Sequence, residues 1–290
     1  MKMLKLLFAS IISLSFLTAC AVAPETEKSE VNLDNIAVTS VAIMQICEAM
    51  DIDLVGVPNT DLAEIPEVYS SATEVGYAMA PDLEILAQLN PEIVLSPVSL
   101  ISDLRPQYEA ANLEYAFMNL SNIHGMFKSI EELGILLDKE TEAQVLIDEY
   151  NAYYEEYQSL TENGDAPTVL ILMGLPGSYV VATENSYVGS LVEVAGGINV
   201  YAGTNSDFLN VNTEDMLLQN PDIILRTAHA LPDEVLKMFV EEFAENDIWK
   251  HFSAVENGEV YDLDSTVFGM SANFEYKTAL ETLKVIFYED

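Results

Sequence analysis

Two residues of metal-binding types stand close to two copies of one sequence motif. Met79 offers a soft thioether sulfur and His229 an imidazole. The first copy of the motif runs from residue 79 to residue 95, and the second from residue 212 to residue 225. We take Met79 and His229 as a candidate ligand pair. The alternatives are ordinary packing for the methionine and a surface or hydrogen-bonded position for the histidine.

Each copy of the motif reads as an acidic helix start, two amphipathic turns, an Asn-Pro break and a short apolar strand. The Asn-Pro pairs begin at Asn90 and Asn220. Their separation is too long for stacked repeats and suits two similar α/β lobes. Glu84 and Glu214 occupy equivalent places, each seven residues before the proline of its pair.

The composition is that of a folded, strongly acidic protein. The chain has 290 residues and is 50% hydrophobic, which is enough to bury one large core or two modest ones. A highly charged disordered chain lacks this apolar content. The 48 acidic residues outnumber 11 basic ones and give a formal net charge of −37. This charge argues against nucleic acid and anionic lipid headgroups as partners, and we interpret it as an adaptation to solubility or habitat.

The N-terminus has the pattern of an export signal. Two lysines and an apolar run precede Leu17-Thr18-Ala19-Cys20, and the length and flanks suit a signal peptide over residues 1–19 rather than a spanning helix. The last four residues resemble a bacterial lipobox, which implies that Cys20 becomes the lipidated (palmitate-bearing) first residue of the mature chain. Residues 20–34 turn polar and predict a tether. Cys47 is expected to be a buried thiol with no disulfide partner.

Short apolar runs alternate with helical patterns along the rest of the chain. This alternation predicts parallel βαβ units and an α/β fold with two Rossmann-like lobes, over residues 35–138 and 163–290. A helical pattern over residues 139–162 predicts one long, rigid helix that joins the lobes. The expected strands are 35–38, 54–58, 168–173, 178–182 and 259–263, and the expected helices include 41–50, 186–195 and 273–287.

Several of these motifs together resemble one class of transport protein. The lipobox, the segment Val55-Gly56-Val57-Pro58, the helix-Asn-Pro-strand unit in both lobes and the helical linker resemble the substrate-binding lipoproteins of ABC importers of the helical-backbone type. The resemblance covers essentially all of the mature chain and implies the class III periplasmic-binding-protein fold. Within that class, Gly76-Tyr77-Ala78-Met79-Ala80-Pro81-Asp82-Leu83-Glu84 and Arg226-Thr227-Ala228-His229 resemble the E-component haem receptors of the iron-regulated surface determinant system.

The resemblance implies that haem (iron protoporphyrin) binds between the lobes with Met79 and His229 as axial ligands. Such a pair makes the iron six-coordinate and raises its potential. The protein would be a monomer, anchored by lipid on the extracellular face of the cell membrane. It would pass haem to an ABC permease and its ATPase for iron acquisition, and cell-wall haem-donor proteins are further expected partners.

Three backbone positions and two carboxylates complete the expected sites. The haem propionates need hydrogen-bond donors, and the helix start at Ser40, Val41 and Ala42 is the best-placed source of free N–H groups. The resemblance implies that Glu84 and Glu214 dock onto arginines of the permease. Their alternative role is to stabilise the positive end of a helix dipole.

Other functions fit the sequence less well. A ferric siderophore receptor of the same fold is the main alternative, although anionic siderophores favour basic clusters and the only arginines are Arg105 and Arg226. A cobalamin receptor stays open because the chain has 14 tyrosines. A Mn or Zn receptor needs converging histidines, whereas His124 and His251 read as structural or exposed residues. We expect no enzyme activity, since no nucleophile elbow, His-Glu-x-x-His pair or phosphate-binding loop is present.

Overall fold

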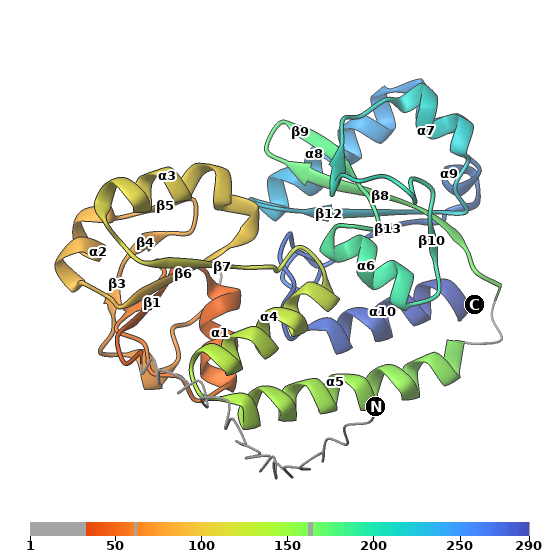
Figure 1. Ribbon diagram of the computed structural model, residues 1–290. Coiled ribbons are helices and arrows are strands. Elements are labelled where there is room, and N and C mark those ends of the chain that lie inside the picture. The colour runs from red at the N-terminus through yellow and green to blue at the C-terminus, as the bar shows by residue number, and fades with distance from the viewer. Residues whose placement is uncertain (1–32, 61–62, 162–164, 290) are drawn as a thin grey trace, which may run out of the picture. The chain divides into compact units, whose positions relative to one another are not determined.

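The structure is a computed structural model that describes residues 33–60, 63–161 and 165–289 (Figure 1). The predicted signal peptide, Cys20 and most of the predicted tether lie outside these residues. The described residues belong to one compact unit. The first half of the sequence forms a five-stranded sheet and a separate two-stranded sheet, the second half forms a six-stranded sheet, and the helix α5 (Glu140–Thr161) connects the two halves.

The first half forms a five-stranded sheet in which every pairing is parallel, as the sequence predicted. The strand order is β3-β2-β1-β6-β7. Strands β1 and β6 are buried along their whole length, which is typical of parallel strands covered on both faces. The elements of this half are β1 (Ile36–Val38), α1 (Val41–Ala49), β2 (Gly56–Val57), η1 (Glu67–Tyr69), β3 (Thr73–Glu74), β4 (Gly76–Tyr77), β5 (Ala80–Pro81), α2 (Leu83–Leu89), β6 (Ile93–Pro97), η2 (Val98–Leu100), α3 (Ile101–Ala111), β7 (Tyr115–Met118) and α4 (Ile123–Leu136).

The second half forms a six-stranded sheet of mixed direction. Its main path is β11-β9-β8-β12-β13, and β10 also pairs with β8. The parallel arrangement predicted here is wrong at β9, which runs antiparallel to β8 and β11. Only Pro176 and Gly177 separate β8 from β9, which is too short for a crossover, and Gly177 takes the positive φ of 80° that such a turn favours. The elements are β8 (Thr168–Leu175), β9 (Ser178–Ala182), α6 (Tyr187–Val194), β10 (Ile198–Asn199), β11 (Phe208–Leu209), α7 (Thr213–Gln219), β12 (Ile223–Ala228), α8 (Pro232–Glu245), η3 (Asp247–His251), α9 (Ser253–Asn257), β13 (Val260–Asp262) and α10 (Tyr276–Tyr288).

The repeated motif folds in the same way in both halves. Helices α2 and α7 have seven residues each, and the side chains of Asp82 and Asn212 cap their first turns. Each helix ends at an asparagine in the left-handed conformation, Asn90 with φ 49° and Asn220 with φ 43°. A proline follows each asparagine and prevents the helix from continuing, so the chain enters a buried strand.

The acidic residue after each proline ties its unit to the neighbouring strand. The Oε2 atom of Glu92 accepts hydrogen bonds from the backbone N–H groups of Asp34 (2.6 Å) and Asn35 (3.1 Å). The Oδ2 atom of Asp222 accepts from the backbone N–H (2.8 Å) and the hydroxyl (2.6 Å) of Thr168. These bonds lower the pKa of Asp222. Equivalent carboxylates therefore fix where the first strand of each sheet begins.

Helix α5 is fastened to both halves of the chain. The ring of Tyr150 stacks on Phe127 of α4 with centroids 4.2 Å apart, and it meets Tyr276 of α10 edge-on at 5.5 Å. The hydroxyl of Tyr157 donates a hydrogen bond to the carbonyl oxygen of Leu280 in α10 at 2.7 Å. Figure 1 shows α5 running alongside α4 and α10. The predicted linker is thus a packed helix with contacts on both sides.

Contacts also cross directly between the two halves. The N–H of Ala272 donates to the carbonyl of Leu120 at 2.8 Å, and the N–H of Ile123 donates to the hydroxyl of Ser190 at 3.2 Å. Cys47 is a fully buried member of the cluster of apolar side chains shared by both sheets, and burial raises the pKa of its thiol to about 12. Among the helices of the described ranges, none has the length and apolar character needed to cross a bilayer.

Candidate functional site

Met79 stands at the tip of a short hairpin. Strands β4 and β5 pair antiparallel with Tyr77 opposite Ala80, so Ala78 and Met79 form a two-residue turn. The side chain of Met79 is 71% exposed and therefore does not serve as core packing. Its sulfur is available to a ligand.

Asn59 holds the base of this hairpin. Its side-chain oxygen accepts from the N–H of Gly76 at 2.6 Å, its backbone N–H donates to the carbonyl of Gly76 at 2.9 Å, and its side-chain nitrogen donates to Glu74 at 2.7 Å. Gly76 has a φ of 94°, and a Cβ there would lie 2.7 Å from the backbone nitrogen of Asp82, so only glycine fits. No local sequence pattern marks Asn59 for this role, because its partner lies 17 residues away.

The helix after the hairpin begins at Leu83, although Pro81 is of a type that often stands in the first turn of a helix. Pro81 instead pairs with Gly76 in the hairpin. Asp82 then caps the helix by accepting a hydrogen bond from the N–H of Glu84 at 3.0 Å. Because the hairpin includes Pro81, Met79 lies in the hairpin turn and not at the start of the helix.

His229 comes directly after the last residue of β12. Its backbone N–H donates to the carbonyl of Gly174 in β8 at 2.9 Å, which fixes the chain at this point. Its side chain is exposed, yet neighbouring atoms partly desolvate the ring and lower the pKa of His229 below its ordinary value. Within the described part of the chain, no hydrogen bond occupies its ring nitrogens. The imidazole is therefore neutral at neutral pH, the form that binds metals.

Met79 and His229 both lie beyond the carboxyl ends of parallel strands. Strand β3 leads through Val75 into the Met79 hairpin, and β12 ends at Ala228. In open α/β sheets, ligands gather at this edge. Met79 follows a strand of the first large sheet and His229 follows a strand of the second. Among the described residues, no hydrogen bond or ion pair links them, so what relates them is that each lies at the carboxyl edge of its sheet.

Ser40 is the N-cap of α1, as the sequence predicted. Its hydroxyl accepts from the N–H of Ile43 at 3.4 Å. Val41 and Ala42 are half-buried, and within the described residues their N–H groups donate no hydrogen bond. Because β1 leads straight into α1, these free donors also lie at the carboxyl edge of the first sheet.

Glu84 and Glu214 occupy the second position of α2 and α7. Both are exposed, and neither forms an ion pair with any described residue. Leu86 and Met216, two positions further along, are fully buried. The two glutamates therefore project from the outer faces of equivalent helices.

The remaining histidines show no sign of a ligand role. His124 is in the first turn of α4, and its ring centroid is 6.4 Å from that of Tyr150. His251 ends the short helix η3. Both are exposed, in line with the expectation of structural or surface roles. In the described ranges, no three His, Cys, Asp or Glu side chains gather as a metal site.

The two arginines differ in their availability. Arg226 is 7% exposed, and its guanidinium donates two hydrogen bonds of 2.7 Å to the carboxylate of Asp262. It also lies over the ring of Phe243, 4.7 Å from the centroid. Arg105 is exposed on α3. Arg226 therefore serves the fold and is not free to bind an anion.

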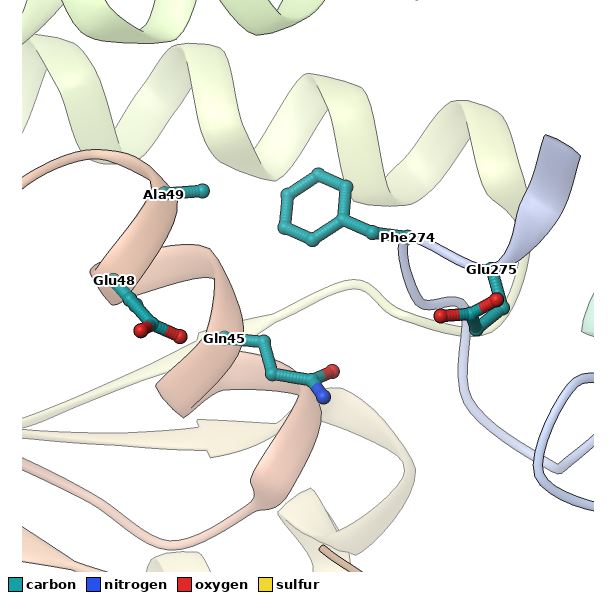
Figure 2. Close-up of a pocket in the computed structure, with 5 residues that line it drawn as sticks. All are labelled: Gln45, Glu48, Ala49, Phe274 and Glu275. Atoms are coloured by element: carbon teal, nitrogen blue, oxygen red, sulfur yellow. The ribbon is translucent and has the colours of Figure 1, made fainter. Parts of the chain in front are cut away.

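A hollow of about 330 Å³ lies between α1 and the segment before α10 (Figure 2). Figure 2 shows Phe274 directed toward Ala49, with Glu48 and Glu275 on the two sides. None of the predicted ligand residues lines this hollow. Its carboxylates also oppose the binding of an anionic molecule.

Comparison with known proteins shows which family has this fold. A family model described as "Periplasmic binding protein" matches residues 36–267. The chain belongs to the periplasmic binding protein family. The predicted class III periplasmic-binding-protein fold is confirmed by this match and by the solved structures that the chain resembles.

Within the periplasmic binding protein family, the chain is similar to proteins of haem uptake. It is 38% identical over 291 residues to the "High-affinity heme uptake system protein IsdE" of Staphylococcus aureus (strain Newman), covering 100% of this chain and 99% of that protein. The crystal structure of S. aureus IsdE complexed with heme matches with a TM-score of 0.83 at 39% identity, covering 89% of this chain and 99% of the other. These matches confirm the resemblance drawn from the sequence.

Two further solved structures are similar to the chain, one at high and one at low sequence identity. An ABC transporter substrate-binding protein from Listeria monocytogenes EGD-e matches with a TM-score of 0.85 at 43% identity, covering 89% of this chain and 100% of that one. The heme-binding protein HutB of Vibrio cholerae matches with a TM-score of 0.68 at 17% identity, covering 88% and 98%. At that identity the likeness shows the fold alone.

Proposed function

We propose that this chain is the haem receptor of an ABC importer and binds haem with Met79 and His229 as the two axial ligands of the iron. The observation that carries this proposal is the exposed Met79 sulfur, held out from the sheet edge on a braced hairpin. The full-length similarity to a haem uptake protein supports it.

The two donor groups suit a six-coordinate iron. A thioether and a neutral imidazole on opposite faces of the macrocycle fill both axial positions and favour the reduced state, relative to two stronger donors. The lowered pKa of His229 keeps its ring unprotonated. With no open position on the iron, the receptor would carry haem without oxygen chemistry, which fits a transport role rather than an enzyme.

The propionates of haem would lie at the start of α1. The free N–H groups of Val41 and Ala42 supply donors there, and the helix dipole favours negative charge. Ser40→Pro should weaken hemin binding severalfold, since it removes the capping hydroxyl and reshapes this turn. An unchanged affinity would place the propionates elsewhere.

A siderophore receptor of the same fold is the less favoured function. Anionic siderophores are usually bound by clusters of basic side chains. Arg226 is already paired with Asp262 in the described structure, which leaves Arg105 on an exposed helix as the other arginine. Haem would carry two propionates to this site, and the N–H groups at the start of α1 can supply donors for them without an arginine.

Delivery of haem would use Glu84 and Glu214. Both are exposed, unpaired within the described residues and equivalent in the two halves. We expect each to meet a basic residue of the permease. Reversing both charges (Glu84→Lys with Glu214→Lys) should leave hemin binding intact and stop uptake, whereas loss of hemin binding would indicate a role in folding.

The lipid anchor at Cys20, the outer face of the cell membrane as location, a monomeric state and cell-wall haem donors belong to the same proposal. Their support is the lipobox-like sequence and the family. Mass spectrometry of the membrane-extracted protein, with Cys20→Ser as control, would reveal the expected lipid on residue 20.

Titration of the purified protein with hemin tests the central proposal. The wild type should give the sharp Soret band and weak far-red charge-transfer band of low-spin Met/His haem. Met79→Ala and His229→Ala should each remove one axial bond and shift the spectrum toward high spin. His124→Ala is the matched control, because it also removes an exposed histidine. Wild-type spectra for both ligand variants would refute the assignment.

A further inference from the structure

Leu218 is an exposed apolar side chain on the helix that carries Glu214. It is 83% exposed, more than any other large hydrophobic side chain described. It lies four positions after Glu214, so the two side chains are neighbours on one face of α7. The opposite face is anchored by Met216, which is fully buried.

The helix beneath this face is held rigidly. Asn212 caps its start by accepting from the N–H of Asp215 at 3.1 Å, and the carboxylate of Asp215 accepts from the hydroxyl of Tyr201 at 2.7 Å. At the other end, the side-chain oxygen of Asn220 accepts from the hydroxyl of Ser253 at 3.0 Å. A partner would therefore meet a helix whose backbone is already ordered, so that only the Leu218 side chain loses freedom on binding.

The first half of the chain lacks this feature. Position 88 is the equivalent of position 218 in the repeated motif, and it is an exposed glutamine on α2. Glu84 and Gln88 repeat the spacing of Glu214 and Leu218. The two docking helices thus share a carboxylate and differ in the side chain next to it.

We propose that Glu214 and Leu218 together form a docking surface for the permease, with Leu218 entering an apolar recess beside the basic residue that meets Glu214. This inference rests on the proposed function, because it takes the permease as the partner of Glu214. It adds that docking through the second half is tighter than docking through the first. An isolated leucine contributes to binding mainly when a recess excludes water around it.

Charge selects the permease over a second copy of this chain. The formal net charge of −37 makes two copies repel one another, and Glu214 and Asp215 lie on the same short helix as Leu218. A surface that carries a basic residue next to an apolar recess complements both members of the pair. Haem is not the occupant, since α7 leads away from the sheet edge and Leu218 lies one turn further from it than Glu214.

Leu218→Gln tests the proposal, because it gives α7 the residue that α2 already has, and both residue types favour helices. Binding of apo-protein to the purified permease–ATPase complex in lipid nanodiscs should weaken about tenfold, as expected for losing the burial of one leucine. Val240→Gln, which alters a side chain 58% exposed on α8, is the matched control and should bind as the wild type does.

The outcomes separate this proposal from the haem proposal. Hemin titration of Leu218→Gln should match that of the wild type. Wild-type affinity of Leu218→Gln for the importer would overturn the docking role, and so would an equal loss in Val240→Gln. Sedimentation that shows a wild-type dimer dissociated by Leu218→Gln would assign the face to a second copy instead. Failure of the wild type to bind hemin would refute the haem proposal without affecting the docking measurement.

Discussion

Removing one oxygen atom from Tyr150 should make the protein more stable. The hydroxyl of Tyr150 is buried and, among the described residues, has no hydrogen-bond partner, although the side chain as a whole is only 5% exposed. Burial raises the pKa of this hydroxyl, in keeping with its poor solvation. Tyr150→Phe keeps the ring that stacks on Phe127 and meets Tyr276, and deletes only the unpaired group.

The size of the effect follows from the cost of an unpaired polar group. A buried hydroxyl without a partner costs about 1–3 kcal/mol, so Tyr150→Phe should raise the free energy of unfolding by about 1 kcal/mol or more. For a chain of this size, each kcal/mol raises the Tm by about 2–4 °C. Tyr157→Phe is the control on the same helix. It removes a hydrogen bond of 2.7 Å to Leu280 and should lower the free energy of unfolding by about 1 kcal/mol.

Urea unfolding and calorimetry of the apo-protein would measure both variants. The two changes in the free energy of unfolding should have opposite signs. This comparison is informative because each variant loses one phenolic oxygen from the same helix. If Tyr150→Phe proves less stable than the wild type while Tyr157→Phe behaves as expected, the hydroxyl of Tyr150 must have a partner such as a buried water molecule. The reasoning from an unpaired group would then be refuted.

Three further changes should have outcomes of known direction. Gly76→Ala should lower the free energy of unfolding by about 1–3 kcal/mol and also lower hemin affinity, because this position combines a positive φ with a backbone clash. Gly177→Ala is the control, because Gly177 has a positive φ but open space around it. It should cost only about 1–2 kcal/mol and leave the hemin spectrum unchanged. The lowered pKa of His229 means that the unfolded chain takes up the proton first, so the apo-protein should lose stability as pH falls through 6.5, and His229→Ala should flatten that slope in urea titrations. Asp222→Ala should cost about 1 kcal/mol at pH 7 by removing the bonds to Thr168, and this difference should shrink below pH 3.8 as the carboxylate becomes protonated; a difference that persists in acid would contradict the role given to the charge.

Local signals account for the parts of the fold that the sequence predicted. The repeated unit could be read because its cap, its left-handed asparagine and its proline are adjacent in the chain, and each acts on its immediate neighbours. The 22 residues of α5 likewise carry their own helical period. The error at β9 has a local cause too, because Pro176 and Gly177 form a hairpin turn that is too short for a parallel crossover.

Parts of the candidate site depend on partners distant in sequence. The exposure of Met79 follows from a hairpin braced by Asn59, and neither the hydrogen bonds nor the clash behind Gly76 has a sequence signature. Burial of Arg226 against Asp262 likewise depends on the pairing of β12 with β13. Residue type and the family motifs around them marked Met79 and His229, whereas the residues that hold them in place are brought close only by the fold.

The repeat in the sequence divides the proposed roles into two kinds. Counted along the repeat, the position equivalent to Met79 is Leu209 and the one equivalent to His229 is Ser99, so the two haem ligands do not correspond. Glu84 and Glu214 do correspond. This is the pattern expected if the two ligands bind opposite faces of one haem molecule while the two carboxylates contact two similar surfaces of the permease. Under that reading, exchanging the ligand types (Met79→His with His229→Met) should still hold haem low-spin, because each half still supplies one donor and the iron accepts either donor on either face. A high-spin spectrum of the exchanged variant would contradict this reading.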